Sequence, residues 1–252
     1  MGYGDRPTRM IGLAELISRA TSGPAYLPDE GDRAEIPIVG LDLPVRASVA
    51  LFLVTLVVLL DYTRTFIPAD ILALGRSPDA VRYQAFERFA LFGLVPLAVV
   101  IAGFRDRPAR YGLQLGEWRW GLGLLLAGIA IMTPLILGLS TLPSFRSYYG
   151  APAGNLANAL VSNALELFPA EFLLRGFLLF VLLRRIGPLA LVVVQVPFIF
   201  AHIGKPELEL YSTFIGGTIF AWLNWRTGSI VWSALGHLYV LTLMMVAVGG
   251  IS

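Results

Sequence analysis

The chain has 252 residues, of which 56% are hydrophobic and only 14% are charged. Because a typical soluble domain has about a quarter of its residues charged, this composition indicates a protein of the lipid bilayer. The formal net charge of +2 is too small to predict a nucleic-acid partner. Cysteine is absent, which excludes disulfides, a cysteine nucleophile and thiolate metal sites.

Residues 1–46 are rich in Gly and Pro, carry charges of both signs and lack the early apolar core of a signal peptide. We therefore expect a cytoplasmic tail here. Between Arg9 and Arg19, apolar residues at helical spacing predict a short helix on the membrane surface: Met10, Ile11, Leu13, Leu16 and Ile17. The alternative is a loosely ordered tail.

Residues 47–252 contain about seven apolar segments, each near the ~20 residues that a membrane-spanning helix needs. The sequence therefore predicts an all-α, polytopic transmembrane bundle in a single membrane domain. The predicted spans are 47–60, 89–104, 120–142, 156–183, 186–202, 210–225 and 228–251. The first is short and could extend to residue 67.

Arginines collect in alternate connections between these spans. They follow the second span, the fourth and the sixth: Arg105, Arg107, Arg110, Arg119, Arg184, Arg185 and Arg226. The positive-inside rule then places these loops and the N-terminus in the cytoplasm. We expect a multi-pass protein of a bacterial-type inner (plasma) membrane.

Ionisable residues inside a membrane are costly, so each is a candidate functional residue. Here they are Glu166, Glu171 and Arg175 in the fourth span, His202 at the end of the fifth and His237 in the seventh. The predicted spans contain no Asp, which argues against an aspartyl intramembrane protease.

Glu171 and Arg175 are four residues apart, so they share a helix face and can pair. Such a pair could be purely structural. Pro169 could kink this helix, and Gly176 would let another helix approach closely. Glu166 lies on a different face of an ideal helix from Glu171, and its simplest place is near the outer interface.

His202 and His237 are the only histidines of the chain. If the fold brings them together, they could, with Glu171, activate water or bind a divalent metal such as zinc. Ser233 lies one turn before His237 and could orient its ring. Glu209 either complements the dipole at the start of the sixth span or folds back beside His202 as a second carboxylate.

Intramembrane proteases fall into a few chemical classes, and the sequence can be compared with the motif of each class. The His-Glu-x-x-His sequence of zinc metalloproteases is absent. Gly138-Leu139-Ser140 followed by His237 matches the Gly-x-Ser sequence and later histidine of a rhomboid-type serine protease. Such a short sequence is common in membrane helices, so this match is weak. A fourth type uses a glutamate and histidines on separate helices.

Three short motifs match that fourth type. Residues 170–177, Ala-Glu-Phe-Leu-Leu-Arg-Gly-Phe, match Glu-Glu-x-x-x-Arg-Gly at all but the first glutamate. Phe198 and His202 match Phe-x-x-x-His, and His237 with Leu241 aligns with His-x-x-x-Asn/Asp. Over about residues 156–249 the chain resembles the CPBP family of CAAX-processing and bacteriocin-processing intramembrane proteases. The resemblance implies an intramembrane hydrolase acting on a membrane-anchored or lipidated peptide.

Two departures from the family pattern matter. In the family, the first glutamate activates water together with the second-motif histidine, and the third-motif Asn helps to hold the oxyanion; here these residues are Ala170 and Leu241. The chain also resembles a branch with a single glutamate and His-x-Gly-Lys-Pro.

Two hypotheses stay open. In the first, Glu171, helped by Glu209, replaces the missing base, His202 shares the water or a metal, and His237 stabilises the oxyanion. In the second, the protein is a catalytically inactive membrane scaffold.

Overall fold

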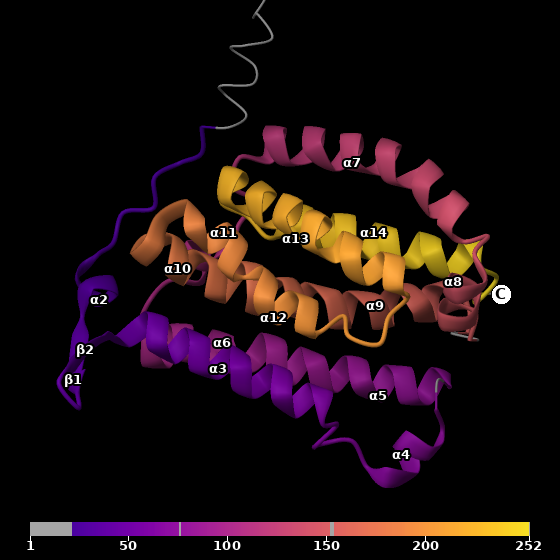
Figure 1. The fold of residues 1–252 in the computed structure, drawn as a ribbon, viewed down its shortest axis with the longest axis horizontal. Helices are drawn as coiled ribbons and strands as arrows, with labels where there is room; N and C mark the ends of the chain where they lie inside the picture. Colours follow the sequence, from indigo (N-terminus) through magenta and orange to yellow (C-terminus); the bar gives the residue numbers. More distant parts are fainter. Residues whose placement is uncertain (1–21, 76, 152–153, 252) are drawn as a thin grey trace, which may run out of the picture.

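The computed structural model describes residues 22–75, 77–151 and 154–251, which form a bundle of helices elongated along one axis (Figure 1). The elements in chain order are α2 (Glu30–Arg33), β1 (Glu35–Ile38), β2 (Leu41–Pro44), α3 (Val45–Tyr62), α4 (Ala69–Ala73), α5 (Pro78–Arg88), the π-helix η1 (Phe89–Leu94), α6 (Val95–Ala98), the π-helix η2 (Val99–Gly103), the 3-10 helix η3 (Pro108–Tyr111), α7 (Trp118–Leu139), α8 (Pro143–Tyr149), α9 (Leu156–Glu171), the π-helix η4 (Phe172–Leu178), α10 (Leu179–Ile186), the 3-10 helix η5 (Gly187–Leu189), α11 (Ala190–Val193), α12 (Gln195–Phe200), α13 (Glu207–Thr227) and α14 (Val231–Ala247).

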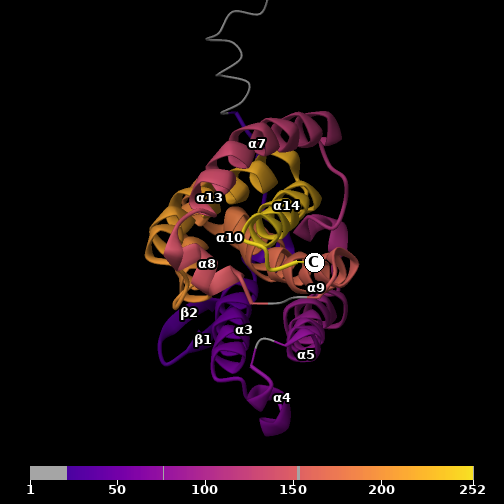
Figure 2. The same ribbon diagram turned by 90° about the vertical axis from the view of Figure 1, so that its right-hand side faces the viewer.

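The helices stack in layers from α3 to α7 (Figure 1). The helix α3 and the continuous segment from α5 to η2 form one side, while α7 covers the other. Figure 2 views the helices nearly end-on, and α14 lies between α7 and α9. The main core surrounds η4, which is buried throughout, and α10, which is buried from Leu179 to Arg184. This arrangement places the first-motif residues 170–177 in the core of the bundle.

Four helical stretches are long and apolar enough to cross a membrane, namely Val45–Tyr62, Pro78–Gly103, Trp118–Leu139 and Leu156–Phe200. With Val231–Ala247, a shorter apolar helix, they support the prediction of an integral membrane protein. The stretch Leu156–Phe200 has two legs, because the chain reverses direction after α10 (Figure 1). The total of seven spans stays a prediction.

The second helical stretch begins eleven residues before the predicted boundary at 89. The Ser77 hydroxyl accepts a hydrogen bond from the Ala80 N–H, and Pro78 occupies the first turn, which together start a helix. The expectation that no span contains Asp was also wrong, since Asp61 lies in the last turn of α3 and is buried. Asp61 is tolerated there because Arg88 bonds it at 2.7 and 3.0 Å.

The predicted fifth span, 186–202, is not one regular helix. Gly187 has a positive φ of 61° and ends α10, and three short helices follow it. Glycine adopts this backbone conformation at little steric cost, so the chain can turn sharply there. The sixth predicted span corresponds to the longer α13, which has Pro206 at its N-cap and Glu207 and Glu209 in its first turn.

Within residues 22–44, the described part of the segment before the first span, the chain forms one short helix and two short strands. Residues 35–44 form an antiparallel hairpin, β1 with β2, that turns through Val39 and Gly40 at positive φ. In α2, Asp29 and Asp32 form a reciprocal capping box. The predicted surface helix around residues 10–17 lies outside the described residues.

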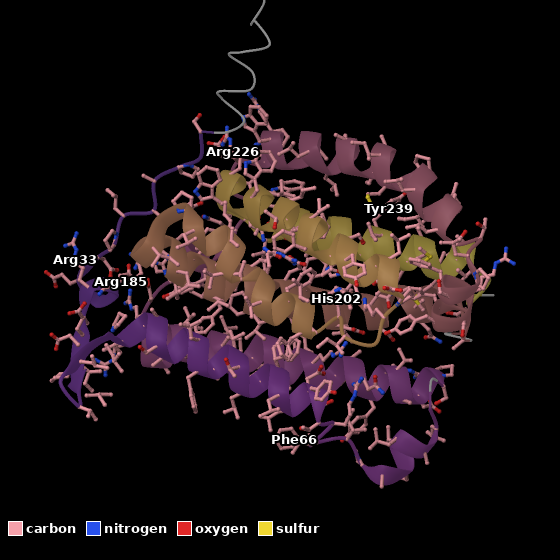
Figure 3. The ribbon with its side chains drawn as sticks, in the orientation of Figure 1. Arg33, Phe66, Arg185, His202, Arg226 and Tyr239 are labelled. Atoms are coloured by element: carbon pink, nitrogen blue, oxygen red, sulfur yellow. The ribbon has the colours of Figure 1, made fainter. Side chains whose placement is uncertain are left out.

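Arginines from four connections gather at one end of the bundle, where Arg33, Arg185 and Arg226 are labelled in Figure 3. There Arg46, Arg110 and Arg184 bind Asp32, and Arg185 pairs with Glu35. The basic loops therefore lie together, as alternating loops of a membrane bundle should. Which side of the membrane they face stays a prediction.

Candidate active site

The helix that carries the first motif changes its winding inside the motif. The helix α9 contains Pro169 and ends at Glu171, and the π-helix η4 continues it. A π-helical turn inside an α-helix is frequent at functional sites, because it redirects side chains. Here Arg175 still reaches back to Glu171 and donates to Oε1. The predicted pair is confirmed, and both side chains are 1% exposed.

The helix α14 supplies the other partners of Glu171. His237 Nδ1 lies 2.9 Å from Glu171 Oε1, and the Ser233 hydroxyl lies 2.9 Å from Oε2. Ser233 also contacts the Ile230 carbonyl at 3.0 Å. The expectation that Ser233 orients the His237 ring was therefore wrong. Ser233 and His237 are one turn apart, so both face Glu171, and Ser233 orients the carboxylate instead.

His202 lies just after α12, and its ring is also anchored through Nδ1. That atom is 2.8 Å from the Phe198 carbonyl. Because a carbonyl only accepts, Nδ1 must carry the proton, and the Nε2 of a neutral His202 is an acceptor. The His202 and His237 ring centroids are 6.5 Å apart with an interplanar angle of 17°. The fold thus brings both histidines and Glu171 into one site.

Aromatic rings enclose the charged pair. The Arg175 guanidinium lies 3.9 Å from the Phe198 ring centroid and 5.4 Å from that of Phe220. Phe198 also packs against His202 with the ring centroids 4.3 Å apart. Cation–π contact compensates part of the desolvation of Arg175, because its Nε and Nη2 have no hydrogen-bond partner among the residues that the structure describes. Phe220 was not a sequence candidate, because an aromatic residue in an apolar helix carries no distinguishing signal.

Three other candidate residues lie outside this arrangement. Glu209 accepts from the Tyr149 hydroxyl at 2.7 Å and from Lys205 Nζ at 2.9 Å. Glu166, which is 25% exposed, pairs with Arg88. The Ser140 hydroxyl, at the end of α7, donates to the Leu137 carbonyl at 2.8 Å.

The two positions that depart from the family motifs are both half-buried. Ala170 precedes Glu171 on α9, and Leu241 lies one turn after His237 on α14. Neither side chain can exchange a proton or donate a hydrogen bond. Any catalysis here must use the groups that remain.

The donor set does not fit a metal. Within the described residues, no group of three or more His, Asp or Glu side chains is arranged to hold an ion. Both Glu171 oxygens and both histidine Nδ1 atoms already have protein partners. A zinc ion bound by Glu171 would have to displace one of the carboxylate's contacts, whereas each histidine keeps its Nε2 free, and we assign no step to a metal.

His237 is the most accessible member of the site. The His237 side chain is 14% exposed, whereas His202 is 8% exposed and Glu171 and Arg175 are each 1% exposed. Two surface hollows occur elsewhere in the described structure, one beside Phe66 and one beside Tyr26, and neither is lined by these residues. His237 is therefore the part of the site that is open to the surface.

The segment that carries the candidate active site is similar to a known protein family. Residues 152–243 match the family described as type II CAAX prenyl endopeptidase Rce1-like. No curated protein and no solved structure matches the chain. The matched segment contains Glu171, Arg175, His202 and His237, and so confirms the resemblance carried by the three motifs. Residues 152–243 of this chain therefore belong to the Rce1-like branch of the CPBP family of membrane proteins.

Proposed function

We propose that the chain is an intramembrane endopeptidase in which His237 is the general base and Glu171 is its positioning carboxylate. The observation that carries the proposal is the 2.9 Å contact between His237 Nδ1 and Glu171 Oε1. A carboxylate in this position holds the imidazole in one tautomer and stabilises the imidazolium that forms on proton transfer. The substrate class is a membrane-anchored or prenylated peptide, as the family match suggests.

This proposal assigns the base differently from the sequence-based hypothesis. Both Glu171 oxygens accept hydrogen bonds, from Arg175, His237 and Ser233. A carboxylate occupied in this way suits orientation better than proton abstraction. Because a carboxylate accepts, His237 Nδ1 must carry the proton that is donated to Glu171. The Nε2 of neutral His237 is then an acceptor, like that of His202. The separation of the rings can be bridged by one water that donates to both.

In the proposed reaction, His237 takes one proton from water and later gives it to the leaving amine. The oxygen of the bridging water attacks the peptide carbonyl carbon, and one proton of the water passes to His237 Nε2. The resulting imidazolium is stabilised by Glu171 and returns the proton to the leaving amine as the C–N bond breaks. His202 orients the water through Nε2. Leu241 supplies no donor to the oxyanion, so we expect turnover to be slow.

The test is cleavage of a prenylated CAAX-type peptide by the full chain in reconstituted vesicles. We expect His237→Gln to abolish cleavage and Glu171→Gln to reduce it by roughly 10²- to 10⁴-fold. Glu166→Gln is a matched control, because it makes the same chemical change on the same helix outside the site. The thermal midpoint of each variant verifies its folding. Cleavage that persists in folded His237→Gln would contradict the proposal.

A second candidate function is a non-catalytic membrane subunit that binds such a peptide. It is supported by the saturation of Glu171, which is 1% exposed, and by Ala170 and Leu241 at the two motif positions. Peptide binding measured in the same vesicles separates the two functions. Binding by the intact protein and by His237→Gln alike, without cleavage by either, would favour the subunit.

A further inference from the structure

A second feature of the membrane domain lies well away from the histidines, beside the end of α3. It is a hollow of about 440 Å³ formed where the loop after α3 meets α5. Its lining consists of three aromatic side chains, two aliphatic ones and one acid: Phe66, Tyr83, Phe86, Ala90, Leu91 and Glu87. The Tyr83 hydroxyl donates to the Phe66 carbonyl at 3.3 Å and ties the two walls together.

Glu87 is the unusual member of this lining. It is 8% exposed, and among the described residues neither of its carboxylate oxygens has a hydrogen-bond partner at normal geometry, although the Phe66 backbone N–H is directed towards the carboxylate. The two nearby cations are engaged elsewhere, Arg88 with Asp61 and Glu166, and Arg64 with Gln84 at 3.3 Å. A buried acid without a partner is costly, so its presence in a hollow indicates that something supplies the partner.

The chemistry of the lining selects a cation. Aromatic faces attract ammonium groups electrostatically, and a carboxylate adds the countercharge. Phe66 and Phe86 are 54% and 58% exposed, so the rings can be reached from outside the protein. The Glu87 oxygens themselves are covered, and direct contact requires a side-chain rotation on binding, which is common at binding sites.

The position of the hollow identifies the source of the cation. Phe66 follows closely after Tyr62, the last residue of a candidate span, and Figure 3 shows it in the loop beyond that helix. In a membrane this is the headgroup level, where aromatic side chains concentrate. Arg82 lies one turn before Phe86 on the same face of α5; it pairs with Asp79 at 3.2 Å but stays 48% exposed, so a phosphate can reach its guanidinium beside Asp79.

We propose that this hollow binds the headgroup of phosphatidylethanolamine, with its ammonium among Phe66, Tyr83, Phe86 and Glu87 and its phosphate near Arg82. The test is native mass spectrometry of the detergent-purified full chain with phosphatidylethanolamine or phosphatidylglycerol, which share the phosphate but differ in the ammonium. We expect about tenfold tighter binding of phosphatidylethanolamine by the intact chain. Glu87→Gln should reduce this preference to less than about twofold.

Asp70→Asn is the control, because it removes one negative charge from the neighbouring helix α4 at an exposed side chain that does not line the hollow and does not pair with Arg82. It should keep the preference. Phe86→Leu retains the carboxylate, removes one ring and should weaken the preference, which keeps the test decisive if Glu87→Gln does not fold. Equal binding of the two lipids by the intact chain, or an unchanged preference in folded Glu87→Gln, would overturn the proposal.

Discussion

At the scale of single residues, the Glu171–Arg175 pair shows how a charge is accommodated inside an apolar bundle. Each side chain is 1% exposed, and the two neutralise each other within one helix. Ser233 and His237 complete the hydrogen bonding of the carboxylate. Removing one partner of such a pair leaves an uncompensated buried charge, which is more harmful than removing both.

Replacing Arg175 with Met should therefore lower the free energy of unfolding by about 3–5 kcal/mol. The double variant Glu171→Gln with Arg175→Met should recover most of this loss, because no buried charge remains. Thermal and denaturant unfolding in detergent measure both effects. If the double variant were as unstable as the single one, the guanidinium would be stabilising through its contacts with Phe198 and Phe220 rather than through charge.

A second residue-scale prediction concerns Leu241, one turn after His237 on α14. Leu241→Asn introduces a donor at the motif position that the CPBP family uses to hold the oxyanion. One oxyanion donor contributes about 10²- to 10³-fold in kcat, so we expect cleavage to accelerate by up to this factor. The peptide-cleavage assay in vesicles measures it. The same substitution combined with His237→Gln should remain inactive, and activity in that double variant would exclude His237 as the base.

At the scale of elements, the contact between α12 and α13 supports the site, because Phe198 of α12 touches both Arg175 and His202. Gly217 makes this contact close. A Cβ atom there would lie 2.2 Å from Gln195 Oε1 and 2.8 Å from the Phe198 ring. The adjacent Gly216 has open space around the same position. Of the two neighbouring glycines, only Gly217 therefore permits close packing of α12 on α13.

These neighbouring glycines form a matched pair for mutation. Gly217→Ala should destabilise the protein by about 1–3 kcal/mol and reduce cleavage, since it displaces Phe198. Gly216→Ala should be neutral or stabilise by up to about 1 kcal/mol, because alanine favours the helix. Unfolding and cleavage assays on the two variants test the prediction. Equal effects would show that α12 can shift away from α13 without consequence for the site.

At the scale of the whole molecule, an ionic network attaches the N-terminal segment to the bundle. Asp29 and Asp32 bind Arg46, and Arg110 joins them from the loop before α7. Burial raises the pKa of Asp29, but the Asp32 backbone N–H and the Arg110 guanidinium outweigh it and hold that pKa below its ordinary value. This network closes the end of the bundle at which the arginines gather.

The sign of this shift predicts a pH dependence. A depressed pKa contributes stability above the unfolded value near 3.9, and that contribution is lost progressively as the pH falls towards the lower folded value. The hydrogen-exchange protection factor of α2, which corrects for the intrinsic pH dependence of exchange, should therefore be constant from about pH 7 to pH 5 and should fall below about pH 4. Asp29→Asn should exchange faster at neutral pH and show a weaker acid response. An acid response that is identical in this variant would assign it to another carboxylate.

The sequence by itself determined that this chain enters a membrane and which residues are candidates for chemistry. Long apolar runs have few structural outcomes, because a backbone in lipid must satisfy its own hydrogen bonds. Glu171, Arg175, His202 and His237 were all identifiable because ionisable groups are rare in such runs. The Glu171–Arg175 pair was also predictable, since its spacing lies within one helix.

The tertiary structure decided which partner each of the remaining groups finds. Ser233 bonds Glu171, which is 62 residues away, and Arg88 bonds Glu166 across 78 residues. Glu209 pairs with Tyr149 rather than reaching His202. Such contacts depend on which helix faces pack together, and this choice is made by the shape and volume of many side chains at once. The spacing of residues along a single helix carries no record of it.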